Sequence, residues 1–304
     1  MTEFRRGDVR ANGVRFATLE AGDGPLVLCL HGFPDHARSF RHQLPVLAAA
    51  GFRAVAPFLR GYAPSDVPTD GPYQSAALAE DAAALLAALS DQPAAVFGHD
   101  WGAVAAYGAA ILTPERVARL ITAAVPHGPS LATAFLTSYE QQRRSWYMFF
   151  FQTPLAEMAL AHDDFRFLER LWTDWSPGWK WPAEEMAALK ATFSQPGVVA
   201  AALGYYRQTL NPLLQRPELA AQQERIQMSP VTVPTLYIHG ADDGCIGLEL
   251  SDGMEALFPA GLERLVVPGA GHFVHQERPD VVNARLLQFL TSVANSSLGV
   301  TNER

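Results

Sequence analysis

The chain has 304 residues, of which 49% are hydrophobic and 18% charged, a balance that excludes intrinsic disorder. Its 23 basic and 31 acidic residues give a net charge of −8, without the basic stripe that marks nucleic-acid binding. Two cysteines, Cys29 and Cys245, are too few for a disulfide framework and form no zinc motif. No apolar run reaches the roughly 18 residues of a membrane span, and no secretory signal opens the chain, so we expect a cytoplasmic protein.

Strand-like and helix-like segments alternate over the first 125 residues. Continuous apolar runs are typical of strands buried on both faces of a sheet. Such runs predict strands over Leu26–Leu30, Arg53–Pro57, Ala94–Phe97 and Val117–Val125, and helical spacing predicts helices over 40–50, 76–89 and 101–112. The alternation predicts a parallel sheet with helices on both faces.

The pattern changes after Pro126. From there to about Met228 no strand is evident, and aromatic residues gather in helical segments, which predicts an inserted helical cap. Strands return at Thr232–His239 and Leu262–Val267, and a helix over 279–293 closes the pattern. We therefore expect two units, an α/β core from residues 1–126 and 229–304 and a helical cap from residues 127–228.

The segment Gly98-His99-Asp100-Trp101-Gly102 follows a predicted buried strand and opens a predicted helix. Its spacing is that of a sharp strand-to-helix turn, with aspartate at the position where serine hydrolases carry their nucleophile. Side chains at 98 and 102 would collide in such a turn, and the helix N-terminus behind Asp100 stabilises negative charge. An aspartate before a helix is also a common N-cap, so the context rather than the bare motif predicts a nucleophile.

The strand Leu26–Leu30 runs directly into the loop His31-Gly32-Phe33-Pro34-Asp35. In a sheet of this kind, the loop after that strand offers a backbone N–H to the active site. We expect the N–H groups of Phe33 and Trp101 to converge on one oxygen of an Asp100 ester as an oxyanion hole. Taken alone, the loop is equally compatible with an ordinary β-turn.

Hydrolysis of an Asp100 ester needs a general base, most often histidine. His272 follows the last predicted strand in the chain order nucleophile, acid, histidine, and His275 is the alternative. The preceding strand is followed by Asp242 and Asp243, of which the G-x-x-D spacing selects Asp243 to orient His272. Two carboxylates alone make a poor calcium site, so we expect no metal.

Taken together, the segments HGFPD, GHDWG, GADD and GHFVHQERP resemble the α/β-hydrolase fold family, and within it the epoxide hydrolases. The resemblance extends from about residue 10 to residue 293. It implies an α/β-hydrolase fold with a mostly parallel central sheet, flanking helices and an inserted cap. It also implies two cap tyrosines aimed at the epoxide oxygen, since a phenol stays protonated at neutral pH. The segment WYMFFFQTPLAE supplies Tyr147 and LGYYRQTL supplies Tyr206, with Tyr139 and Tyr205 as their rivals.

The activity implied by this resemblance is conversion of an epoxide and water to a vicinal diol through a covalent aspartyl ester, without a cofactor. The expected partners are water and a small hydrophobic epoxide, which would be bound by Phe33, Trp101, Tyr147, Phe151 and Tyr206. A haloalkane dehalogenase would use the same nucleophile, but Phe33 stands where dehalogenases usually place a second halide donor. A non-catalytic binding protein on the same scaffold is a further alternative, which the intact catalytic positions disfavour.

Two features leave their interpretation open at this level. The tryptophan-rich segment 172–181 favours packing within the cap over lining of the pocket. The sequence is compatible with a monomer or a homodimer.

Overall fold

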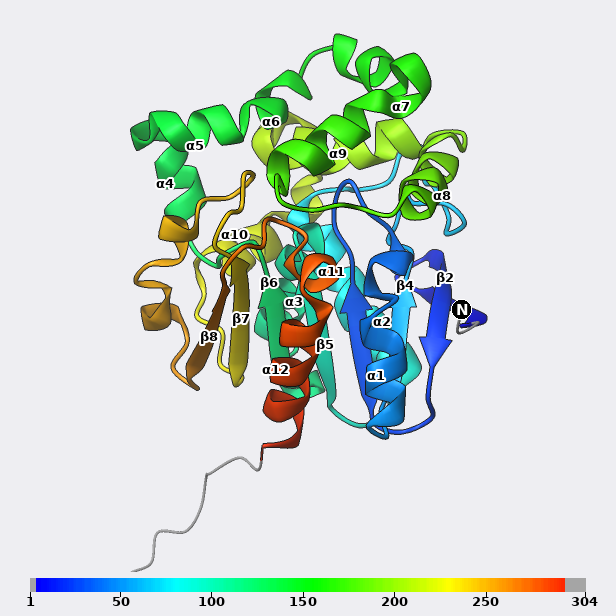
Figure 1. The fold of residues 1–304 in the computed structure, drawn as a ribbon, viewed down its shortest axis with the longest axis vertical. Coiled ribbons are helices and arrows are strands. Elements are labelled where there is room, and N and C mark those ends of the chain that lie inside the picture. Colours follow the sequence, from blue (N-terminus) through cyan, green and yellow to red (C-terminus); the bar gives the residue numbers. More distant parts are fainter. Residues whose placement is uncertain (1–3, 293–304) are drawn as a thin grey trace, which may run out of the picture.

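The computed structural model describes residues 4–292, which form one eight-stranded sheet beneath a layer of helices (Figure 1). The strand order is β1-β2-β4-β3-β5-β6-β7-β8. Both pairings of β2 are antiparallel, and the remaining pairings, from β4 to β8, are parallel. The strands are β1 (Arg5–Ala11), β2 (Val14–Ala21), β3 (Leu26–Leu30), β4 (Arg53–Pro57), β5 (Ala94–His99), β6 (Val117–Ala123), β7 (Thr235–Gly240) and β8 (Leu262–Val267).

Helices cover the sheet because its central strands are apolar on both faces, and β3 and β5 are buried at every position. The flanking α-helices are α1 (Gln43–Ala49), α2 (Ser75–Leu89), α3 (Trp101–Leu112), α10 (Ala220–Met228), α11 (Val274–Glu277) and α12 (Pro279–Thr291). Figure 1 shows α11 and α12 in front of the sheet and α3 behind it. The 3₁₀ turns are η1 (Ala37–Phe40), η2 (Pro114–Arg116), η3 (Pro212–Leu214), η4 (Pro217–Leu219), η5 (Leu248–Ser251) and η6 (Met254–Leu257).

The predicted mostly parallel sheet is confirmed, and β3, β4, α3 and β8 have the predicted bounds. The helix predicted over 40–50 is divided, because η1 ends at Phe40 and α1 begins only at Gln43. The closing helix α12 ends at Thr291, and the predicted end at Val293 lies outside the described residues.

The hairpin of β1 and β2 was not predicted from the sequence. Its strands carry many charged residues, since β1 is a largely exposed edge strand. The hairpin turns at Asn12 and Gly13, which both have positive φ, at 46° and 73°. Asn-Gly between two strand-like segments is a strong signal for a tight hairpin turn, and it could have revealed β1 and β2.

A layer of helices lies above the carboxyl ends of the parallel strands (Figure 1). They are α4 (Ser130–Thr137), α5 (Tyr139–Arg144), α6 (Trp146–Phe150), α7 (Leu155–Trp175), α8 (Ala183–Phe193) and α9 (Val198–Leu210). Residues 162–165 interrupt α7 with non-helical backbone angles. The last helix of the predicted cap segment, α10, instead packs against α2 and α3, so we propose that the cap ends before it.

Among residues 4–292, no helix is both long enough and apolar enough to cross a lipid bilayer.

Candidate active site

Asp100 occupies the turn between β5 and α3 with φ at 53°, a conformation that is strained for a residue with a side chain. The flanking glycines permit this turn. A Cβ at Gly98 would overlap the carbonyl oxygen of Gly102, and one at Gly102 would overlap that of Leu30. The carboxylate of Asp100 is held at the carboxyl edge of the sheet and is only 8% exposed.

The loop after β3 donates a hydrogen bond to Asp100. The N–H of Phe33 lies 2.7 Å from Asp100 Oδ1. Gly32 allows this approach, because a Cβ there would overlap the Asp100 side chain. The second predicted donor, the N–H of Trp101, makes no hydrogen bond to Asp100 in the described chain, so its part in an oxyanion hole stays a prediction.

His272 and Asp243 come together from the loops after β8 and β7. Nδ1 of His272 lies 2.9 Å from Asp243 Oδ2, and Nε2 lies 3.6 Å from Asp100 Oδ2 without a hydrogen bond. The other oxygen of Asp243 accepts the N–H groups of Cys245 at 2.7 Å and Ile246 at 2.9 Å. These three hydrogen bonds fix Asp243 and leave the free ring nitrogen of His272 directed at Asp100.

The charges of the two aspartates dominate the ionisation of His272. Burial lowers the pKa of His272, but Asp243 and Asp100 outweigh burial and raise it to about 10. Burial raises the pKa of Asp243, and the neighbouring His272 reverses this, so that the pKa lies below its usual value. The structure therefore favours an imidazolium between two carboxylates while Asp100 is free.

The rival residues of the acid and the base lie elsewhere. Asp242 is exposed. His275 is buried beneath the site, with its ring centroid 5.1 Å from that of Phe40 and 4.5 Å from that of His99. Neither of its nitrogens has a hydrogen-bond partner among the described residues, so it is hydrogen-bonded to neither Asp100 nor Asp243.

The rings of Tyr147 of α6 and Tyr206 of α9 meet edge to face with centroids 5.7 Å apart, near enough to Asp100 to feel its charge. Burial raises the pKa of both phenols well above the usual value, and the Asp100 carboxylate adds to this shift. The hydroxyl of Tyr206 has no hydrogen-bond partner among the described residues. Tyr205 points away and donates to the Arg60 carbonyl at 2.7 Å, and Tyr139 is 76% exposed.

Aromatic rings enclose the carboxylate. The ring of Phe33 lies 5.3 Å from that of Tyr206 and 5.5 Å from that of Phe151, and the Trp101 ring lies 5.0 Å from Tyr206. The tryptophan-rich segment contributes as well, since Trp175 lies 4.7 Å from the Tyr147 ring. Trp172 of the same segment instead packs between Trp179 of the cap and Phe273 of the core, and it donates its indole N–H to the Pro34 carbonyl at 2.8 Å.

Cys245 is a site residue that the sequence analysis did not select. Its Sγ lies 3.2 Å from the Tyr147 hydroxyl, and the side chain is fully buried. Burial, followed by the charges of Asp243 and Asp100, raises the pKa of the thiol well above its usual value, so Cys245 is a neutral group here. Its place two residues after Asp243, in a loop that reaches the active site, was the available signal.

Two groups of buried side chains have the residue types of metal ligands. Ligand atoms of Asp243, Cys245 and His272 lie within 4.8 Å of one another, as do those of a second group, Asp35, His99 and His275. In the first group, His272 and Asp243 are already hydrogen-bonded to each other, and the Cys245 thiol is neutral. A metal would have to break that bond, so the arrangement favours a proton-transfer site.

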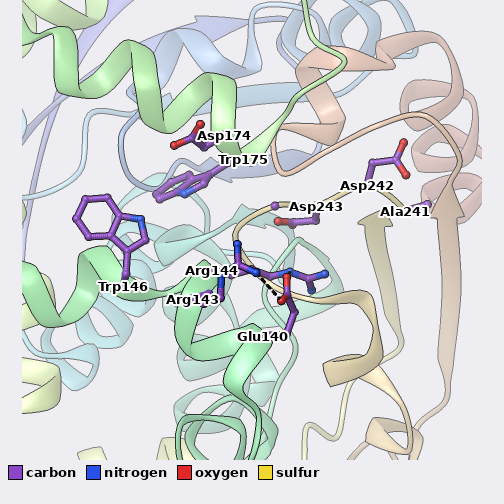
Figure 2. A pocket seen from close by; sticks show the side chains of 10 residues that line it. Glu140, Arg143, Arg144, Trp146, Asp174, Trp175, Ala241, Asp242 and Asp243 are labelled. Carbon is purple, nitrogen blue, oxygen red and sulfur yellow. Dashed lines mark hydrogen bonds and ion pairs between the residues drawn. The ribbon is translucent and has the colours of Figure 1, made fainter.

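A cavity of about 510 Å³ lies on the outer side of the acid loop (Figure 2). Arg143, Arg144 and Glu140 of α5 line one wall, and Asp242 and Asp243 of the loop after β7 line another. Asp100 does not line this cavity. The polar hollow thus shares Trp175 and Asp243 with the site but does not reach Asp100.

The family model described as the alpha/beta hydrolase fold matches residues 25–279, and the chain belongs to this family. Epoxide hydrolase 4 of Mus musculus is 32% identical, with 93% of this chain and 78% of that protein covered. Epoxide hydrolase A of Mycobacterium tuberculosis is 30% identical, with 94% and 97% covered. The crystal structure of Bacillus megaterium epoxide hydrolase in complex with an inhibitor has a TM-score of 0.82 at 29% identity, covering 94% of this chain and 100% of that chain. These relatives place the chain in the epoxide hydrolase group of the family.

Proposed function

We propose that the protein is a cofactor-independent epoxide hydrolase that forms a vicinal diol through an ester of Asp100. The observation that carries this proposal is the different surroundings of the two Asp100 oxygens. Oδ1 accepts the Phe33 N–H at 2.7 Å, whereas Oδ2 carries no such bond and lies 3.6 Å from His272 Nε2. Oδ2 is thus free to attack, while Oδ1 already occupies the position in which an oxyanion would be stabilised.

In the first half-reaction, Oδ2 attacks a ring carbon and the carbon–oxygen bond of the epoxide breaks. The departing oxygen stays on the substrate as an alkoxide, which needs a proton. Tyr147 and Tyr206 can supply it, because their raised pKa keeps both phenols protonated at neutral pH. The phenolate that remains regains its proton from the His272 imidazolium before water attacks.

Ester formation removes the negative charge of Asp100, which is one of the charges that raise the pKa of His272. The pKa of His272 therefore falls in the ester, and the imidazolium can release its proton to the phenolate left by the first step and then act as a base. It takes a proton from water, whose oxygen attacks the ester carbon. The bond between that carbon and Oδ2 then breaks, and the diol leaves with a proton on Oδ2 while the Asp100 carboxylate is restored. Asp243 stabilises the imidazolium, and the Phe33 N–H stabilises the charge on Oδ1.

We further propose water and a small hydrophobic epoxide as the partners. The walls around Asp100 are buried aromatic rings, which match an apolar substrate. We also propose the cytoplasm as the compartment, since Cys29 and Cys245 are both free buried thiols.

The test is a single turnover in ¹⁸O-labelled water with enzyme in excess over styrene oxide. The first diol should carry an unlabelled oxygen from Asp100, and the peptide that contains Asp100 should gain the label in mass spectra. In the His272→Gln variant, the ester should accumulate as a mass adduct on that peptide. A solvent-labelled first diol with an unlabelled peptide would show that Asp100 acts as a general base. Halide release from a bromoalkane without diol formation from any epoxide would favour the dehalogenase.

A further inference from the structure

The end of the cap helix α7 is hydrogen-bonded to both loops that carry the base and the acid. The carbonyl oxygen of Trp175 accepts the N–H of His272 and the N–H of Gly244, each at 3.0 Å. One residue further on, the hydroxyl of Ser176 accepts the N–H of Phe273 at 3.2 Å, across 97 residues of sequence. A single short segment of the cap therefore touches the catalytic loops on both sides.

A partly buried carboxylate, that of Glu277, closes this connection. The Ser176 hydroxyl donates to Glu277 Oε1 at 2.6 Å, and Oε2 of the same side chain accepts the N–H of Gly271 at 2.9 Å. Gly271 and Phe273, whose N–H groups make these bonds, immediately precede and follow His272 in the chain. Ser176 and Glu277 together hold the backbone on both sides of the base.

The end of α7 approaches the two catalytic loops so closely that only glycine fits at Gly271 and Gly244. A Cβ at Gly271 would lie 2.5 Å from Ser176 Cα and 2.6 Å from the Trp175 carbonyl oxygen. A Cβ at Gly244 would overlap the carbonyl oxygen of Asp174. Ser176 is fully buried. The two loops and the cap thus meet backbone to backbone, so that a displacement of one displaces the other.

We propose that Ser176 is a positioning residue for the base, and that the Ser176–Glu277 pair holds His272 in line with Asp243 and Asp100. The kinetic part of this inference rests on the proposed function. His272 must keep 2.9 Å to one carboxylate and 3.6 Å to the other, and small displacements of a catalytic group are costly. The base is therefore aligned only while the end of α7 is docked on its loop.

The first experiment follows the His272 imidazole by NMR in the full-length protein during a pH titration, without any substrate. Ser176→Ala removes both hydroxyl bonds without adding atoms, so the imidazole should move from its carboxylates and titrate at least about one pH unit lower. Thr173→Ala is the matched control on the same helix, because Thr173 is exposed and its hydroxyl bonds only to the Glu169 carbonyl, at 2.9 Å. An unchanged His272 titration in Ser176→Ala would overturn the inference.

The second experiment separates the half-reactions by stopped flow. Ser176→Ala should slow ester hydrolysis about ten-fold or more and change alkylation less than about three-fold, because the base acts in the second step. Glu277→Ala should show the same division, and the double variant should be little slower than the slower single variant, since both act through one chain of bonds. Equal slowing of both steps, or additive losses, would indicate a general structural role and contradict the proposal. If the wild-type protein formed no diol, the proposed function would fail, while the NMR titration would still decide the positioning of His272.

Discussion

Tyr205 and Tyr206 are adjacent buried tyrosines with opposite surroundings, which makes them a matched pair for testing the catalytic assignment. The Tyr205 hydroxyl donates to the Arg60 carbonyl at 2.7 Å, so it supports the contact between α9 and the core. The Tyr206 hydroxyl has no hydrogen-bond partner among the described residues and faces the enclosure above Asp100. Replacement of each tyrosine by phenylalanine should therefore change different properties of the protein.

The expected magnitudes follow from these contacts. Tyr206→Phe removes a hydrogen bond to a developing alkoxide, worth about 1.5–3 kcal/mol for a charged acceptor. This corresponds to a roughly ten- to 150-fold slower alkylation step. The same change removes a buried polar atom without a partner, so the free energy of unfolding should stay the same or rise. Tyr205→Phe removes a neutral hydrogen bond, which should lower the free energy of unfolding by about 1 kcal/mol and leave alkylation within about two-fold of wild type.

The assay combines stopped-flow fluorescence of the alkylation step with urea unfolding of the same two variants. The aromatic enclosure contains Trp101 and Trp175, which provide the fluorescence signal. A wild-type alkylation rate in Tyr206→Phe, together with a ten-fold loss in Tyr205→Phe, would refute the assignment and make Tyr205 the acid. Equal losses in both variants would show that the packing of α9 controls the rate, and that the hydroxyl does not.

Three further predictions test the remaining groups. Asp243→Asn should slow ester hydrolysis at least about ten-fold, and it should slow alkylation less. Asp242→Asn, at an exposed position, should leave both rates within about two-fold of wild type. The reverse result in single-turnover kinetics would reassign the acid to Asp242. Cys245→Val should remove the partner of the Tyr147 hydroxyl and slow alkylation about three-fold, whereas Cys245→Ser should keep the wild-type rate. Equal alkylation rates in both variants and the wild type would show that Cys245 does not support Tyr147. The pKa of His272 is raised to about 10 in the folded protein. Its contribution to the free energy of unfolding is therefore complete below pH ~6.5 and is lost as the pH rises through about 10. His272→Gln should flatten this part of a plot of unfolding free energy against pH.

Features that depend on neighbours in the chain could be predicted from the sequence. The apolar run of β3 and the elbow around Asp100 are local, because a buried strand needs continuous apolar residues and a sharp turn needs glycine. The chain order of Asp100, Asp243 and His272 likewise follows from the order of the parallel strands, whose carboxyl ends share one edge of the sheet. The edge hairpin was missed because β1 is largely exposed and neither β1 nor β2 has a continuous apolar run.

Features that depend on distant contacts required the tertiary structure. Tyr205 and Tyr206 are consecutive tyrosines, so the sequence around them does not distinguish them. Their side chains point about 100° apart on α9, and only the docking of this helix decides which of them faces Asp100. The contacts of Cys245 with Tyr147 and of Ser176 with Phe273 join segments separated by 98 and 97 residues. No periodicity or spacing encodes such pairs, because they arise when the cap packs onto the sheet and side chains from both units fill the same volume.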